Sequence, residues 1–145
     1  MADVSDPEIK QAYEDVRSKS ASTWLVLKYD EGKKDKVVLA ATGEGDPFES
    51  IKPLLQPDQV NFAYAKIVYA VDKESTREKF VLFTYIGPEV KIMRRAKISV
   101  QKADVTQVLR TYSIEVPLES ADQLQEEAVI NKLKSVGGAN YGPGT

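Results

Sequence analysis

The stretch REKFVLFTYIGPEVKIMRRAK, from Arg77 to Lys97, carries the clearest structural signal in the chain. Its part Phe80–Ile86 is an almost continuous apolar run, which is typical of a strand covered on both faces of a sheet. Gly87 and Pro88 then interrupt the strand, and a basic segment with a helical pattern follows. These residues therefore predict a central strand, a sharp break and a helix in direct succession.

The residues before this stretch predict a helix, a hairpin and a third strand. Asp6-Pro7-Glu8 is typical of a helix start, with a capping side chain, a proline in the first turn and an acid near the positive end of the helix dipole. Apolar residues follow at helical spacing and predict one buried face. That face consists of Ile9, Ala12, Tyr13 and Val16. We expect strands at residues 24–29, 37–41 and 60–71, a short helix at 47–55, and loops at 31–35, 43–47 and 72–79.

The segment from residue 89 to 112 has a helical pattern whose apolar phase changes midway. Two apolar faces result, and at about 100° per residue they lie on roughly opposite sides of a helix. They consist of Ile92, Ala96, Val100 and Ala103, and of Val105, Val108, Leu109 and Tyr112. Because one straight helix cannot bury both faces against one surface, we predict a bend or break between Lys97 and Asp104.

The C-terminal part predicts a short strand at residues 114–116 and a last helix. Ser120 and Gln123 have the spacing of a capping box and predict where that helix starts. Gly137-Gly138 is expected to end the helix, and residues 137–145 are expected to form a flexible glycine-rich tail. The element order predicts one α+β domain over residues 1–136. Its mixed sheet would have about five strands, flanked by helices on both faces.

Composition narrows the function. The 145 residues include no cysteine and no histidine, which removes the commonest nucleophile–base pairs and metal ligands. We therefore expect no enzymatic activity, no cofactor and no bound metal. Gly43-Glu-Gly45 resembles a fragment of a phosphate loop but lacks its Lys-Ser/Thr and its full spacing. The acidic N-terminus lacks the apolar core of a signal peptide, and the apolar runs are too short to span a bilayer, so we expect a cytoplasmic protein.

Charge is unevenly distributed although the formal net charge is only −2. Residues 91–110 hold six basic residues and one acidic residue, whereas residues 113–130 hold five acidic residues and none that is basic. The ordinary interpretation of the basic segment is a solvated helix face. Its charges lack acidic neighbours at helical spacing, however, and Ile98 falls among them on a helical wheel. Both features favour a surface that binds an acidic partner, and Arg77 and Lys79 in the preceding loop would extend it.

Four sequence stretches resemble the coactosin group of the actin-depolymerising-factor homology (cofilin-like) family. They are AYEDVRSKSASTWLVLKYD from Ala12, REKFVLFTYIGPEV from Arg77, RRAK from Arg94 and LKSVGGANY from Leu133. The resemblance covers nearly the whole chain. It implies a gelsolin-like mixed sheet between helices and binding to the sides of actin filaments. The acidic N-terminus departs from the phosphoregulated serine segment of cofilins, and the middle of the long helix departs from their small-residue pattern, so severing is not implied.

The resemblance also implies site residues. The lysine that precedes the fourth strand of coactosins corresponds to Lys79, and basic residues of the long helix correspond approximately to Arg94, Arg95 and Lys97. Together with the charge pattern, this gives a candidate actin-binding set of Lys73, Arg77, Lys79, Arg94, Arg95, Lys97, Ile98 and Lys102. We hypothesise that the loop and helix residues form one patch.

The expected partner is filamentous actin. The basic charge is split between two segments, and we expect both to be needed for appreciable affinity, so binding to monomeric actin should be weak or absent. We expect no nucleic acid, no membrane insertion and a monomeric protein. The alternative function is a module that binds anionic lipid headgroups or nucleic acid through the same basic residues. It is weakened for nucleic acid because no exposed aromatic residue can be placed beside the bases.

Overall fold

The computed structural model describes residues 2–18 and 20–139. Within them, five strands form one sheet in the order β2-β1-β3-β4-β5. Only the β4–β5 pair is parallel, which makes the sheet mixed as predicted. The strands are β1 (Ser22–Tyr29), β2 (Val37–Glu44), β3 (Val60–Ala70), β4 (Thr76–Ile86) and β5 (Ile114–Leu118). The helices are α1 (Pro7–Arg17), α2 (Pro47–Ile51), α3 (Ile92–Thr106) and α4 (Glu126–Ala139), with 3₁₀ turns η1 (Lys52–Leu54) and η2 (Ala121–Gln123).

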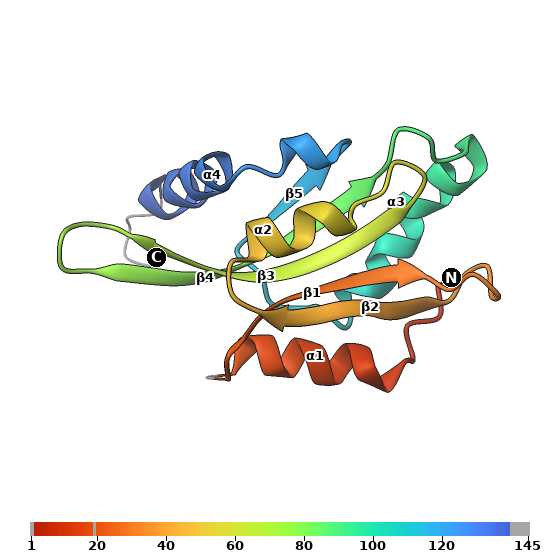
Figure 1. The fold of residues 1–145 in the computed structure, drawn as a ribbon, viewed down its shortest axis with the longest axis horizontal. Coiled ribbons are helices and arrows are strands. Elements are labelled where there is room, and N and C mark those ends of the chain that lie inside the picture. The colour runs from red at the N-terminus through yellow and green to blue at the C-terminus, as the bar shows by residue number, and fades with distance from the viewer. Residues whose placement is uncertain (1, 19, 140–145) are drawn as a thin grey trace.

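Helices cover both faces of the sheet (Figure 1). Side chains of α1 and α3 pack on one face in a single apolar cluster, and side chains of α2 and α4 pack on the other face in a second cluster. The predicted central strand is correct, because β4 lies between β3 and β5 and its residues 81–85 are all buried. No helix among the described residues combines the length and the apolar character that crossing a bilayer requires.

The start of α1 is confirmed and also ties the helix to the sheet edge. The Asp6 carboxylate accepts a hydrogen bond from the Glu8 backbone N–H at 3.0 Å and another from the Leu39 N–H at 3.2 Å. The second bond occupies an outward-facing donor of edge strand β2, which would otherwise lack a partner. All four residues of the predicted apolar face are buried.

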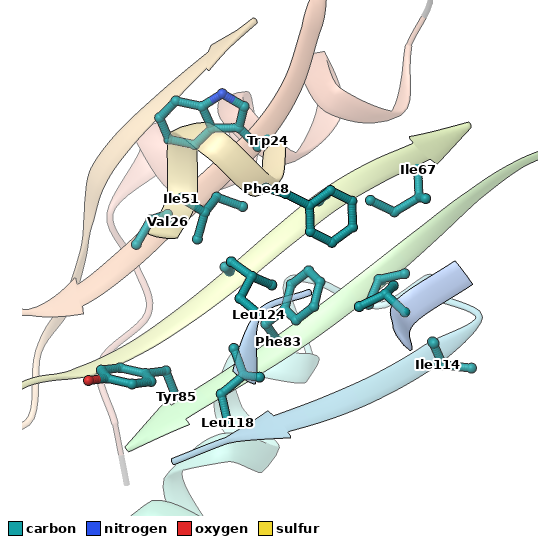
Figure 2. Packing of buried hydrophobic residues seen from close by; sticks show 14 of the residues in the cluster. Trp24, Val26, Phe48, Ile51, Ile67, Phe83, Tyr85, Ile114, Leu118 and Leu124 are labelled. Atoms are coloured by element: carbon teal, nitrogen blue, oxygen red, sulfur yellow. The ribbon is translucent and has the colours of Figure 1, made fainter. Parts of the chain in front are cut away.

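The apolar residues of the central strands divide between two clusters, one on each face of the sheet. Phe48 and Ile51 of α2 lie over Trp24 and Val26 of β1, and Leu124 lies near Phe83 and Leu118 of the other half of the sheet (Figure 2). Since successive strand residues point to opposite faces, Val81, Phe83 and Tyr85 belong to this cluster while Leu82 belongs to the cluster on the α1 and α3 face.

The predicted break within the long helix is wrong. The helix α3 runs without interruption from Ile92 to Thr106, and its chain leaves the helical path only at Gln107. The phase change has another cause. The face with Ile98 and Val105 is buried against the sheet, whereas Ile92 and Val100 point into solvent. Of the second apolar set only Val105 lies in α3, because the helix ends at Thr106 and Val108, Leu109 and Tyr112 follow it. One helix therefore never has to bury both sets.

Three further boundaries differ from the predictions. Arg77 and Lys79 lie in β4 rather than in a loop, because β3 and β4 pair from Val60↔Ile86 to Ala70↔Thr76. The last helix starts at Glu126 instead of Ser120. Ser120 instead precedes η2 (Ala121–Gln123), and the Gln123 side chain accepts from the Glu119 N–H at 2.7 Å. At its other end, α4 continues through Gly137 and Gly138 to Ala139 instead of ending at the glycine pair. Residues 140–145 of the predicted tail lie outside the described residues.

The break after β4 depends on a glycine. The Gly87 N–H donates to the Gln59 carbonyl at 3.0 Å, and the Glu89 N–H donates to the Pro57 carbonyl at 2.8 Å. A Cβ at Gly87 would lie 2.2 Å from the Pro57 carbonyl oxygen, which is backbone and cannot move independently. Close approach of two chain segments therefore requires glycine here.

We expect Gly87→Ala to lower the free energy of unfolding by about 1–3 kcal/mol, the usual cost of forcing extra volume into a packed site. Urea denaturation of both proteins would measure the difference. Gly32→Ala is a control, since a Cβ there would meet its nearest atom, Oδ2 of Asp30, at an ordinary 3.6 Å. Equal stability of Gly87→Ala and the natural protein would contradict this account of the turn.

Candidate functional site

The long β3–β4 hairpin presents three of the predicted residues without internal partners. Its closed end projects beyond the rest of the sheet (Figure 1). Lys73 lies at the tip and Arg77 and Lys79 lie on β4; we call these three the hairpin surface. Within the part of the chain that the structure describes, none of the three side chains makes an ion pair or hydrogen bond. Their charges are therefore available to a partner.

The hairpin surface belongs to the face of the sheet that carries α4. In register, Lys79 lies opposite Ile67 and Arg77 lies opposite Tyr69. Ile67 and Tyr69 are buried in the cluster that contains residues of α4, and alternation along β4 places Arg77 and Lys79 on the same side as Val81. The tip is held by the Asp72 carboxylate, which accepts from two backbone N–H groups of the turn at 2.8 and 2.9 Å.

Arg94 has internal partners, contrary to the interpretation of the basic segment as uncompensated charge. Its guanidinium donates to the Lys34 carbonyl at 2.7 Å, lies 4.2 Å from the Tyr29 ring centre and lies 3.6 Å from the Asp35 carboxylate. Lys97 lies 3.7 Å from the same carboxylate. The two residues hold α3 against the turn between β1 and β2.

Gln101 completes this connection. Its amide nitrogen donates to Asp35 at 2.9 Å, and its amide oxygen accepts from the Tyr29 hydroxyl at 2.6 Å. Burial of the phenol raises the pKa of Tyr29 to about 12, partly offset by the charge of Arg94. The hydroxyl therefore stays protonated and remains a donor at neutral pH. Arg94, Lys97 and Gln101 therefore all connect α3 to the turn between β1 and β2.

The other two basic residues predicted on α3 also have partners. Arg95 donates to the carbonyls of Val90 at 3.0 Å and Gly87 at 2.8 Å, and so fixes the turn that leads into the helix. Lys102 lies 2.7 Å from the carboxylate of Glu115, which also accepts from Thr84 at 3.1 Å. These side chains are partly exposed, but their main contacts are internal.

Ile98 does not lie on the surface. Only 2% of the residue is exposed, and it packs in the core beneath α1 and α3. The exposed apolar residues are on the opposite side of the same helix: Ile92 is 82% exposed, Met93 74% and Val100 65%. We call this side the outer face of α3. It consists of Ile92, Met93, Ala96, Ser99, Val100 and Ala103.

The sequence contained a signal for the outer face of α3. The first of the two apolar sets in residues 89–112 includes Ile92 and Val100, and the prediction failed by assuming that every apolar set is buried. An exposed apolar stripe on a continuous helix is instead a candidate interaction site. Met93 was not selected by the pattern because it follows Ile92 directly.

The hairpin surface and the N-terminal end of α3 are well separated, so the hypothesis of a single patch is wrong. Lys79 precedes the Gly87 turn by eight residues of strand, which corresponds to about 26 Å. The helix α3 packs on the α1 side of the sheet, whereas Arg77 and Lys79 lie on the α4 side. The chain therefore presents two distinct surfaces.

The Asp35 contacts predict a response to acid. The hydrogen bond from Gln101 lowers the pKa of Asp35 most; desolvation opposes it, and the charges of Lys97 and Arg94 lower the pKa further. Because the folded pKa lies below the unfolded one, this stabilisation is present above about pH 4 and is lost as pH falls through the folded value. We expect the urea midpoint to drop on acidification from pH 6 to pH 3, and to drop less in Asp35→Asn. An identical acid response in both proteins would contradict a role for Asp35.

Among residues 2–18 and 20–139, no three acidic, histidine or cysteine side chains are grouped as a metal site would require. The two surfaces consist of cations without internal partners and of exposed apolar side chains. These are chemical groups suited to docking against another macromolecule, by charge attraction on the hairpin surface and by apolar burial on the outer face of α3.

Comparison with known proteins identifies a family. The family model described as "Cofilin/tropomyosin-type actin-binding protein" matches residues 1–134. Coactosin of Dictyostelium discoideum is 41% identical over 142 residues, which cover 97% of this chain and 95% of that protein.

Solved structures agree with the sequence comparison. The crystal structure of coactosin from Entamoeba histolytica superposes with a TM-score of 0.84 at 28% identity, covering 94% of this chain and 97% of that one. The solution structure of mouse coactosin, described as an actin filament binding protein, gives a TM-score of 0.75 at 28% identity, covering 97% and 95%. The chain therefore belongs to the cofilin/tropomyosin-type actin-binding family and is similar within it to the coactosins.

Proposed function

We propose that this protein binds the sides of actin filaments and regulates filament dynamics without enzymatic activity or strong severing. Family membership supports actin as the partner. The observation that carries the proposal is the pairing of two outward surfaces on opposite faces of one small domain, one cationic and one apolar. A filament side offers neighbouring subunits, and two separate surfaces on one domain can contact two of them.

The outer face of α3 would dock against one subunit. Its three large apolar side chains are 65–82% exposed, and their burial in a groove would remove apolar surface from water. Small residues between them, such as Ala96 and Ala103, allow the helix backbone to approach a partner closely. The Arg94–Asp35 contacts hold this face at a fixed angle, so little ordering cost remains for binding.

The hairpin surface would contact a second subunit through charge. Lys73, Arg77 and Lys79 make no ion pair in the described residues, so their charges can pair with acidic groups of an actin subunit. Once the outer face of α3 is bound, the hairpin acts at high effective concentration, so the two contacts reinforce each other. On a single actin monomer only one of the two surfaces can be engaged at a time, because the second contact needs a neighbouring subunit, so binding to the monomer should be weak or absent. We further propose that the protein acts as a monomer.

Co-sedimentation tests this function against the alternative of lipid or nucleic-acid binding. The protein should pellet with actin filaments in saturable fashion at physiological salt. Pelleting with vesicles of anionic lipid, or a shift of RNA in a gel, should be negligible under the same conditions. Strong vesicle or RNA binding without filament binding would overturn the proposal.

A further inference from the structure

A second cluster of cations lies away from both docking surfaces. A cavity of about 760 Å³ opens between α1 and the segment 107–111 that follows α3. Its lining includes Lys10 and Arg17 from α1 and Arg110 from the segment, against a single acid, Glu14. The volume is within the roughly 300–1,000 Å³ usual for small-ligand sites.

The walls of this cavity are held in place. The Thr111 N–H donates to the Tyr13 hydroxyl at 3.0 Å, and the Tyr64 hydroxyl donates to the Thr111 carbonyl. The backbone N–H and carbonyl of Thr111 are thus fixed by Tyr13 of α1 and Tyr64 of β3. The segment that carries Arg110 is thereby tied to α1 and β3, and the cavity exists before a ligand arrives.

Arg17 is also held in position. Its guanidinium carbon lies 5.7 Å from the Tyr13 ring centre and 5.6 Å from the Phe80 ring centre, both within cation–π range. Burial by itself would raise the pKa of Tyr13, but the hydrogen bond from Thr111 and the charge of Arg17 lower it overall. The surroundings of the cavity therefore favour negative charge.

We propose that this cavity binds a small organic ligand that carries two or more phosphate groups. Cations on both walls suit a ligand with phosphates at more than one point, since guanidinium groups bind phosphate oxygens in pairs. Lys10 and Arg110 have no ion-pair or hydrogen-bond partner in the described part of the chain. Tyr13 and Val108 supply apolar lining against which an organic ring can pack.

The test uses the full chain and does not involve actin. Calorimetric titration with inositol hexakisphosphate and with ATP at 0.15 M salt should show one saturable site for at least one of them. The double variant Lys10→Glu/Arg110→Glu should weaken that binding about tenfold or more, because two charge-assisted contacts are lost. Its melting temperature should change little, since both side chains are exposed and without partners and the new acid at position 10 is only weakly repelled by Glu14.

The control is Lys33→Glu/Lys52→Glu, which changes the net charge equally. Neither residue lines the cavity. This control double variant should bind inositol hexakisphosphate and ATP within about twofold of the natural protein. Equal weakening in both double variants would show attraction by net charge and overturn the proposal, as would the absence of binding to both probes. Binding to vesicles of anionic inositol lipids without binding to either soluble probe would also contradict it.

Discussion

Replacing Lys79 with alanine is expected to weaken filament binding by about 2–5 kcal/mol, the range for truncating one partner of a buried charge pair. Lys79 is the half-buried member of the hairpin surface, and its stem lies beside the buried Ile67. Co-sedimentation of the variant with filaments over a range of concentrations would give the change in affinity.

Lys52→Ala is the matched control for this experiment. Lys52 is also half-buried, lies in η1 and makes no ion pair within the described residues. Both variants should unfold within about 0.5 kcal/mol of the natural protein, because partly exposed charges without partners add little stability. Unchanged filament affinity of Lys79→Ala would remove this lysine from the contact.

Val100→Asp is expected to reduce filament affinity by about 2–4 kcal/mol, as loss of a central interface residue does. Val100 lies in the middle of the outer face of α3, and 65% of it is exposed. The substitution removes apolar contact and places a negative charge opposite an acidic partner. Because Val100 belongs to neither apolar cluster of the core, the fold should remain intact.

Val100→Ala separates the two causes. It removes apolar surface without adding charge, so we expect an intermediate loss of affinity. Far-ultraviolet circular dichroism should show the same helix content in all three proteins. If Val100→Asp binds filaments as tightly as the natural protein does, the outer face of α3 is not a docking surface.

Elements whose determinants are local could be predicted from the sequence. Asp6 and Pro7 act within one helical turn, and the apolar face of α1 repeats at helical spacing, so both the start and the buried side of α1 were correct. Phe80–Ile86 was recognised as a central strand because both faces of a covered strand must be apolar. The family resemblance added a mixed sheet between helices but no strand order.

The sequence contained a pattern that could have placed the hairpin surface relative to α3, namely the alternation of strand side chains. Strand side chains alternate, so Arg77, Lys79 and Val81 share one side of β4. Treating residues 72–79 as a loop discarded that alternation. The resulting expectation of one patch followed from closeness in sequence, which says nothing about which face of a sheet a residue occupies.

The shared acidic partner of Arg94 and Lys97 could not be predicted from sequence because it is distant along the chain. Asp35 lies in the turn between β1 and β2, and it meets Arg94 and Lys97 only after the sheet and α3 have packed. Charge counting within residues 91–110 therefore overestimated the free positive charge. The same packing decides which apolar face of α3 is buried.

The central claim is that two separate surfaces bind two actin subunits, and comparing monomeric with filamentous actin tests it most directly. Labelled actin in each form should be titrated with this protein at low and at physiological salt. We expect clearly tighter binding to filaments than to monomers, and filament affinity that falls as salt rises, because the hairpin contact is electrostatic and is screened over about 8 Å at physiological salt. Equal or tighter affinity for the monomer, or filament binding indifferent to salt, would contradict the two-surface account.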